Sequence, residues 1–295
     1  MSSPQPTKRK ITRRRFLSGV AVVGVGAIGS WEWANHVEPF WTETTRLDIV
    51  LPNLPSAFDG FQIAQISDIH IENGGMRAHF PSLCDRVTAL DADCIVVTGD
   101  FVTIATIWAQ DYFIQTLPRL RAREGVFGVR GNHDVISIQF PIPGQPCDMS
   151  VAMREGGVRE LFNEVHTFER GGQPLHLAGV DDPWLGDPDI KLVENKIPKG
   201  EAAVLLAHEP DAALIYSWGE RFGLMLSGHS HGGQICLPGG FPLRVPPMSE
   251  LFPRGLYRTR QMWHYTNRGL GTVGPTIRFC SRPEISLFTL RCAAS

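Results

Sequence analysis

The sequence predicts an α/β fold built on parallel strands, and three features of the chain support this prediction. Short apolar runs alternate with helix-compatible stretches through the first half of the chain. The 30 glycines and 22 prolines among 295 residues indicate many turns and long loops rather than a helical bundle. Polar residues of the types found in active sites follow directly after the strand-like runs. Asp68, Asp100 and Asn132 follow three successive runs at a spacing of 32 residues.

Strands and helices are predicted in alternation after residue 45. In the first half we expect strands over 46–51, 61–68, 94–98 and 126–129, with helices over 76–90 and 107–122. The run Cys94–Thr98 is apolar throughout, which is typical of a strand buried on both faces. Parallel strands joined in this way bring their carboxyl ends, where ligands bind, to one edge of a sheet.

The second half continues the pattern less regularly. We expect strands over 175–180, 203–206, 224–226 and 285–290, a helix over 211–218, and loops over 137–150 and 237–256. No internal repeat and no second boundary interrupts the chain. Residues 46–295 are therefore interpreted as a single domain.

Charge is distributed unevenly along the chain. The first 15 residues hold six cations (Lys8, Arg9, Lys10, Arg13, Arg14 and Arg15) and no acid. Without these six, 22 of the 28 basic residues remain against 30 acidic ones, a net charge near −8. An acidic body cannot neutralise a phosphate backbone, so no nucleic-acid binding is expected.

The basic start is followed by an uncharged stretch, Phe16–Gly29, which has the form of an export signal. Thr12-Arg-Arg-Arg-Phe-Leu17 resembles the twin-arginine signal. This predicts export by the twin-arginine translocase to a periplasmic or extracytoplasmic location, with residues 1–34 as signal or membrane anchor. Trp31, Trp33 and Trp41 suit a membrane interface. Cleavage and retention as an anchor stay equally open, and a basic tail with a chance arginine pair is the alternative.

Five short motifs carry metal-ligating side chains. They are Asp68-Ile-His70, Gly99-Asp100, Gly131-Asn132-His133-Asp134, Ala207-His208 and Gly228-His229-Ser230-His231. Taken singly, each motif is weak, because an isolated Asp-x-His or Gly-Asn-His-Asp is usually a turn or surface feature. Together and at this spacing, they predict a hydrolytic metal site with enough oxygen and nitrogen donors for two divalent cations.

The spacing within the motifs explains how two cations would be shared. Asp68 and His70 are two residues apart on an extended chain, so their side chains share a face, and His229 and His231 repeat that arrangement. Asp100 has two carboxylate oxygens and is able to bridge two metals.

The remaining two donors complete the set. Asn132 offers a neutral oxygen and His208 a further nitrogen. A set of nitrogen and oxygen donors without thiolate suits Mn, Fe, Zn or Ni.

In these motifs the chain resembles the calcineurin-like metallophosphoesterase superfamily. The motifs span residues 66–233, and the resemblance extends over about 46–291. The segments Tyr265–Gly271, Arg278 and Pro283–Ile285 resemble a bacterial, membrane-associated branch that includes twin-arginine-exported members. The resemblance implies a β-sandwich of mixed sheets flanked by helices.

The family pattern also implies a division of the ligands between two metals. The first metal would be held by Asp68, His70, Asp100 and His231, and the second by Asp100, Asn132, His208 and His229. A hydroxide between the metals would attack phosphorus in line. His133 resembles the family histidine that stabilises charge or protonates the leaving oxygen.

One departure from the family pattern narrows the function. Protein phosphatases of this superfamily extend the second motif with an Asp that orients the catalytic histidine, and Thr103 replaces it here. This argues against a protein phosphatase and leaves the orientation of His133 open. Asp134 is interpreted as a loop-capping residue. Arg130 could meet phosphate or form a structural ion pair.

A few other residues are weaker candidates. His79, Asn267 and Arg268 could line the cleft, the last two by family resemblance only.

The favoured function is a metal-dependent phosphodiesterase or pyrophosphatase acting on lipid-linked or nucleotide-linked phosphoesters. A retained anchor would favour lipid-linked substrates, because it would hold the site near the bilayer. A phosphomonoesterase and a non-catalytic metal-binding scaffold of the same fold are the alternatives, and the complete set of seven ligands speaks against the scaffold.

Overall fold

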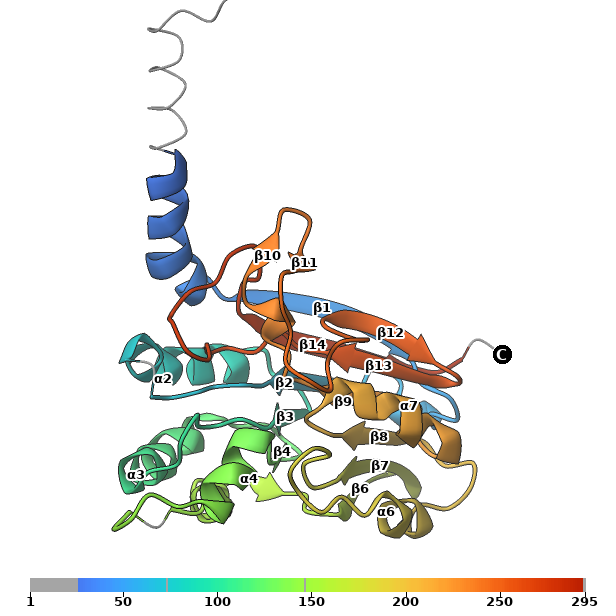
Figure 1. The fold of residues 1–295 in the computed structure, drawn as a ribbon. Helices are drawn as coiled ribbons and strands as arrows, with labels where there is room; N and C mark the ends of the chain where they lie inside the picture. Colours follow the sequence, from blue (N-terminus) through green and yellow to red (C-terminus); the bar gives the residue numbers. More distant parts are fainter. Residues whose placement is uncertain (1–25, 73, 146, 294–295) are drawn as a thin grey trace, which may run out of the picture.

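The computed structural model describes residues 26–72, 74–145 and 147–293. The proposed twin-arginine motif at residues 12–17 lies outside them. Residues 26–36 form a helix that extends from the body of the molecule (Figure 1). Within the described residues, no helix combines the length and apolar character needed to cross a membrane.

Two six-stranded mixed sheets form the body. The first has the order β1-β14-β2-β3-β4-β5 and the second the order β12-β13-β9-β8-β7-β6. The strands of the first sheet are β1 (Glu43–Val50), β2 (Gln62–Ile66), β3 (Cys94–Thr98), β4 (Val126–Val129), β5 (Arg159–Glu160) and β14 (Glu284–Arg291). Those of the second are β6 (Glu164–Arg170), β7 (Gln173–Gly179), β8 (Ala203–Leu206), β9 (Leu224–Ser227), β12 (Gly255–Thr259) and β13 (Met262–Thr266).

Strand pairing follows the predicted parallel pattern in the centre of each sheet. β2, β3 and β4 are parallel neighbours, as are β7, β8 and β9. The antiparallel pairs are β14 with β2, β12 with β13, and β6 with β7. A separate short hairpin joins β10 (Cys236–Leu237) to β11 (Phe241–Pro242).

Helices cover the outer face of each sheet (Figure 1). The α-helices are α2 (Gly74–Thr88), α3 (Ile107–Thr116), α4 (Asn132–Gln139), α5 (Met149–Glu155), α6 (Ile190–Lys196) and α7 (Ala213–Tyr216). Single 3₁₀ turns are η1 (Glu38–Phe40), η2 (Ser56–Phe58), η3 (Leu117–Arg119), η4 (Pro210–Ala212), η5 (Ser217–Gly219) and η6 (His231–Gly233).

Three apolar clusters hold the layers together. The first packs α2, α3 and α5 on the first sheet, and the third packs α6 and α7 on the second. The cluster between the sheets combines side chains of both, for example Ile63 and Val96 with Leu206 and Leu226. The prediction of two mixed sheets flanked by helices is therefore confirmed.

Two predicted helices are shorter than expected. The helix expected over 107–122 ends at Thr116 and continues as η3, because Pro118 lacks an N–H and its ring crowds the preceding turn. The helix expected over 211–218 is one α-helical turn between two 3₁₀ turns, and the chain after it turns left-handed at Glu220.

Other differences concern strands and loops. The loop expected over 137–150 is shorter than predicted, because α4 extends to Gln139 and α5 begins at Met149. The sequence predicts no strand at β5, β6, β12 or β13, and the loop expected over 237–256 contains strand β11. β6 and β12 are outer strands of their sheet and are only partly buried, so they lack a clear apolar signature.

Candidate metal centre

The seven candidate ligands meet where the carboxyl ends of strands from both sheets converge. Asp68 and His70 follow β2, Asp100 follows β3, and Asn132 begins α4 after β4. His208 follows β8, and His229 and His231 follow β9. The first sheet thus supplies four of the side chains and the second supplies three, as expected for loops beyond parallel strand ends.

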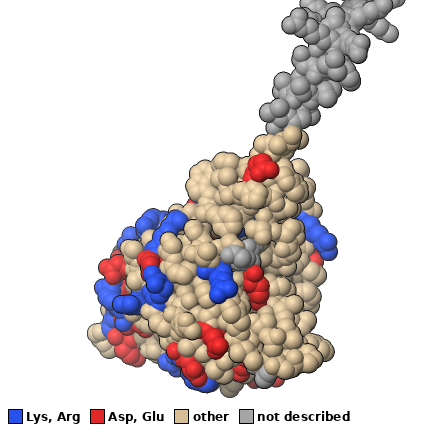
Figure 2. All heavy atoms as spheres, turned by 90° about the vertical axis from the view of Figure 1, so that its left-hand side faces the viewer, with Lys and Arg blue, Asp and Glu red and all other residues tan. Residues whose placement is uncertain are grey.

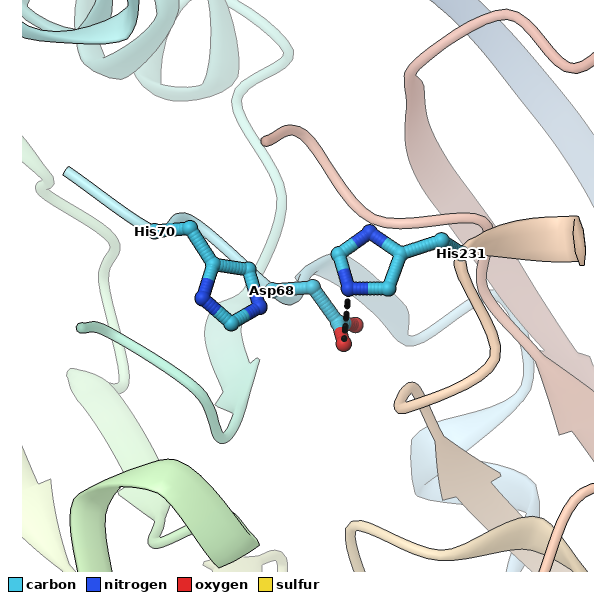
Figure 3. Close-up of side chains that lie close together, drawn as sticks. All are labelled: Asp68, His70 and His231. Atoms are coloured by element: carbon cyan, nitrogen blue, oxygen red, sulfur yellow. Dashed lines mark ion pairs between the residues drawn. The ribbon is translucent and has the colours of Figure 1, made fainter. Parts of the chain in front are cut away.

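Asp68, His70 and His231 form the first group. One ligand atom from each residue lies within 4.8 Å of those of the other two, and all three side chains are buried. The side chains point toward one another in Figure 3, where the dashed line joins His231 Nε2 to Asp68 Oδ1 at 3.5 Å. The rings of His70 and His231 are stacked with centroids 5.0 Å apart.

Asp100, His208 and His229 form the second group under the same 4.8 Å limit. Asn132 adjoins it, because its Oδ1 lies 3.0 Å from His229 Nδ1. Asp100 links the two groups. Its Oδ2 lies 3.1 Å from His208 Nε2 and 3.6 Å from His70 Nε2, so one carboxylate oxygen faces a histidine of each group.

The backbone is strained where it presents these side chains. Asp68, His70, Asp100, His229 and His231 all have positive φ, between 45° and 69°. This left-handed conformation is uncommon for residues other than glycine, and it persists only where surrounding structure enforces it. The concentration of strained residues at the ligand positions is typical of a functional site.

Glycines next to the ligands allow their close approach. A Cβ on Gly99, whose φ is +92°, would lie 2.6 Å from His208 Nδ1. A Cβ on Gly228 would overlap Ser67 Oγ and Asp68 Oδ2. No larger residue fits at these two positions without moving a candidate ligand.

The donor atoms fit metal cations. Among the described residues, His70 Nε2 is buried without a hydrogen-bond partner, and His208 Nε2 is buried with the Asp100 carboxylate 3.1 Å away. His229 Nε2 lies 2.8 Å from the Pro247 carbonyl oxygen, while its Nδ1 faces the Asn132 amide oxygen. Both neighbours are acceptors, and a neutral imidazole carries only one N–H. When Nε2 carries the proton and donates to Pro247, the lone pairs of Nδ1 and of Asn132 Oδ1 face each other. A cation between these two atoms would bind both.

Burial controls the charge of the histidines. It lowers the pKa of His70 to about 3 and that of His229 to about 4, so both imidazoles are neutral at pH 7 and offer a lone pair. Burial also lowers the pKa of His208, but Asp100 and Glu209 outweigh it and raise this pKa well above its usual value. A positive charge between His208 and Asp100 is therefore favoured.

The two carboxylates respond differently to the same burial. It raises the pKa of Asp68 to about 6. For Asp100 the effect of burial is outweighed by His208, His133 and His70, which hold its pKa below the usual value. Asp100 is thus the more firmly anionic of the two, as a bridging ligand requires.

Thr103 orients two histidines through different atoms. Its hydroxyl Oγ1 lies 3.0 Å from His70 Nδ1, and its backbone oxygen lies 2.9 Å from His133 Nδ1. The orientation of His133, which the sequence left open, is therefore set by a main-chain carbonyl. The backbone N–H of His133 also donates to Asp100 Oδ1 at 2.9 Å.

Two carboxylates hold the loop that carries Thr103. Asp134 accepts hydrogen bonds from the backbone N–H groups of Asp100, Phe101 and Gly131, which confirms it as a loop-capping residue. Glu72 accepts from the N–H groups of Thr103 and Ile104. The loop is thus held at both ends by carboxyl oxygens that accept from its backbone N–H groups.

The weaker candidates have structural roles. Arg130 pairs with Asp181 at 2.7 Å and with Glu160 at 3.4 Å, which favours the ion-pair interpretation. His79 packs edge-on against Phe40.

The candidates from the Tyr265–Gly271 segment also serve the fold. Asn267 is buried and donates to Ser286, while Arg268 pairs with Glu43 and Glu284. Arg278 is fully buried and donates to backbone oxygens, among them those of His231 and Gly271, so it ties together loops on both sides of the first group.

Sequence reasoning missed a buried acidic pair beside the second group. Asp182 and Glu209 both have a raised pKa, mainly because they are buried. The two carboxyl groups also interact with each other. Glu209 Oε1 lies 3.9 Å from His229 Nδ1. Asp182 accepts from the N–H of Trp184, whose ring meets His229 edge-on. Asp182 stands three residues after the end of β7, so the rule that places functional side chains after parallel strands could have located it.

A cavity of about 850 Å³ opens onto both groups. Asp100, Asn132, His133, His229 and His231 lie on its polar side. The rest of its wall is mostly apolar, formed by side chains such as Ile136, Trp184, Leu185, Ile235, Leu243, Val245, Pro246, Pro247, Val273 and Pro275. Much of this wall comes from the segment expected to be a loop, so the loop shapes the substrate side of the site.

Fold and site together define a metallophosphoesterase. The chain belongs to the calcineurin-like phosphoesterase family, whose family model matches residues 61–233. It is 33% identical over 289 residues to the uncharacterized metallophosphoesterase YkuE of Bacillus subtilis, covering 96% of this chain and 99% of that protein.

Two further relatives have named activities. The chain is 28% identical to the UDP-2,3-diacylglucosamine pyrophosphatase LpxG of Chlamydia trachomatis, covering 89% of this chain and 93% of that protein. It is 27% identical to the phosphodiesterase YaeI of Escherichia coli, covering 95% and 99% respectively. These relatives, together with the two groups of candidate ligands, support a phosphoester hydrolase.

Proposed function

We propose that this protein is a phosphodiesterase or pyrophosphatase that works with two divalent metal ions. The observation that carries the proposal is the convergence of two ligand groups on Asp100, whose Oδ2 faces a histidine of each group. Asp68, His70, Asp100 and His231 would hold one ion. Asp100, Asn132, His208 and His229 would hold the other.

The bound ions would lower the pKa of a water molecule and neutralise phosphoryl oxygens. Asp68 and Asp100 carry two negative charges against four positive charges of the ions, which leaves a net positive site for an anionic phosphoester. His133 Nδ1 donates to the Thr103 carbonyl oxygen, so Nε2 is the free nitrogen of this ring. His133 lines the cavity, and its protonated form would stabilise or protonate the leaving oxygen through Nε2.

The substrate is proposed to carry an apolar group next to its phosphoester. The mostly apolar wall of the cavity supports this, and so does the relationship to a protein named for hydrolysis of a diacylated sugar nucleotide. Lipid-linked phosphoesters combine both features, and nucleotide-linked ones share the phosphate chemistry. We further propose that residues 1–34 direct the chain out of the cytoplasm by the twin-arginine route.

The test uses the full chain loaded with Mn²⁺ and assayed on bis(p-nitrophenyl) phosphate and p-nitrophenyl phosphate. We expect diester hydrolysis that a chelator abolishes, with roughly two ions bound per chain. Asp100→Asn should remove both the activity and the bound metal, because both ion positions depend on this carboxylate.

Asp111→Asn, on the exposed side of α3, is the matched control and should keep both properties. Faster turnover of the monoester would identify a phosphomonoesterase instead. A fully metal-loaded protein that cleaves neither ester would contradict the proposal and support a scaffold.

A further inference from the structure

The β10–β11 hairpin exposes large apolar side chains. Leu237, Phe241 and Leu243 are 53%, 69% and 61% exposed. They flank a tight turn in which Gly239 and Gly240 both have positive φ. In Figure 1 this hairpin stands out from the body on the side where the helix of residues 26–36 leaves it. Exposed apolar side chains gathered on a protruding element are typical of a binding surface.

The N-terminal helix and the residues after it expose aromatic side chains on the same side. Trp31 is 61% exposed and Trp41 is 49% exposed. Figure 2 shows the face from which this helix emerges, and its upper part is mostly uncharged while charged side chains gather lower down. The surface next to the helix therefore carries few charged side chains.

Hydrogen bonds connect the hairpin to the N-terminal helix through the segment 278–281. The backbone N–H of Cys236 in β10 donates to the Phe279 oxygen at 2.8 Å. The neighbouring Arg278 N–H donates to the Ala34 oxygen at 2.9 Å, and the Ser281 N–H donates to Glu38 at 2.7 Å. The hairpin and the helix are thus held in one arrangement on the same side of the molecule.

The residues that precede the N-terminal helix indicate that the partner of this surface is a lipid bilayer. The helix is preceded by the uncharged stretch that begins at Phe16, and before that come six cations without an acid. Apolar residues next to a cationic cluster complement a bilayer, whose core is apolar and whose surface carries phosphate. Tryptophan is the residue that best suits the boundary between the two.

The base of the hairpin also forms a wall of the metal-site cavity. Ile235, Leu243, Arg244 and Val245 line it, and Arg244 is exposed there. A surface in contact with lipid at the hairpin would therefore border the entrance to the candidate metal centre. A guanidinium at this border can hold the phosphate of a headgroup.

We propose that Trp31, Trp41, Leu237, Phe241 and Leu243 form a bilayer-docking surface that places the mouth of the metal-site cavity at the lipid headgroups. An apolar substrate would then pass from the bilayer along the base of the hairpin to the metal centre. Docking itself does not require the proposed hydrolytic activity, because it rests on the exposed surface alone.

Hydrogen–deuterium exchange of the full chain tests the surface directly. The protein is compared alone and bound to vesicles of phosphatidylcholine and phosphatidylglycerol. We expect exchange over residues 237–243 to slow about tenfold on the vesicles, while exchange over 213–219 is unchanged. Failure to bind vesicles, or equal exchange in the hairpin with and without them, would overturn the proposal.

Two charged substitutions sharpen the result. Phe241→Asp should lose the protection of the hairpin on vesicles. Ile215→Asp, at a side chain that is 66% exposed on α7, should keep it. Equal protection in both variants would count against the docking surface. Both variants should hydrolyse soluble bis(p-nitrophenyl) phosphate as the wild type does. An inactive wild type would refute the proposed function and leave the exchange result to be judged separately.

Discussion

At the scale of single residues, Thr103 shows how a small side chain replaces a carboxylate. Its hydroxyl contacts His70 and its carbonyl contacts His133, so one residue sets the orientation of a candidate ligand and of the candidate catalytic histidine. In the sequence, only the absence of the Asp is visible at this position. A backbone carbonyl has no signature in the sequence, so this function became visible only in the folded loop.

Thr103→Val should weaken metal binding while leaving His133 in place. Valine has a similar shape but lacks the hydroxyl, so His70 loses its hydrogen-bond partner. The hydrogen bond from His133 to the backbone carbonyl of residue 103 is retained. Loss of an interaction that orients a metal ligand typically lowers affinity by about 10–100-fold. Calorimetric titration with Mn²⁺ measures the change. Thr103→Ser serves as the control and should bind almost normally; unaltered affinity in the valine variant would show that the hydroxyl is dispensable.

At the scale of elements, β13 carries a buried histidine that is separate from the metal centre. His264 packs against the rings of Phe252 and Tyr257, and its Nε2 lies 3.2 Å from Thr266 Oγ1. Burial alone lowers its pKa to about 3. The folded state therefore favours the neutral imidazole. Protonation of His264 in the folded protein would place an unfavourable positive charge in the core.

This burial predicts a specific loss of stability in acid. His264 titrates near 6.5 in the unfolded chain and near 3 in the folded chain, so the unfolded state binds more protons between these values. Its contribution is complete above pH 6.5 and is lost as the pH falls toward 3. Between pH 7.5 and 4.5 it should amount to about 2–3 kcal/mol of unfolding free energy.

His264→Phe should remove that part of the pH dependence. Urea unfolding of wild type and variant at pH 7.5 and 4.5, both with a chelator, isolates the contribution of His264, because the metal-site histidines titrate alike in the two proteins. Parallel losses of stability in wild type and variant would show that the imidazole is already charged in the folded state.

At the scale of the whole molecule, the candidate metal centre depends on how the two sheets pack. Asp68 and Asp100 come from the first sheet and His208 and His229 from the second, so the ligands meet only when the core between the sheets has formed. Any ion bound at this centre bridges the two halves of the sandwich and stabilises the folded state over the unfolded one.

Added Mn²⁺ should therefore raise the midpoint of thermal unfolding. At one hundred times the dissociation constant, each site contributes about 2.7 kcal/mol. For a chain of this size, that corresponds to an increase of roughly 5 °C or more. Differential scanning calorimetry of the chelated and loaded protein measures the shift. Asp100→Asn should show none, and a midpoint independent of Mn²⁺ in the wild type would mean that the centre does not hold the ion.

The candidate site residues and their positions at strand ends follow from local sequence patterns. Each candidate ligand follows a strand whose apolar pattern is local, and Asp68, Asp100 and Asn132 follow neighbouring parallel strands as their spacing predicted. Local pattern also located β3, β4 and β8 at their observed bounds. These features depend on residues close together in the chain, which is why they could be predicted.

How these parts meet depends on contacts between residues far apart in the chain. The packing of the two sheets placed the candidate ligands that follow β8 and β9 against those of the first sheet, and it brought Glu209 and Asp182 to the same site. Packing also set the Thr103 carbonyl on His133 and placed the β10–β11 hairpin beside the N-terminal helix. Such contacts join residues far apart in the chain, and their free energy comes from burial and hydrogen bonds that no local pattern records.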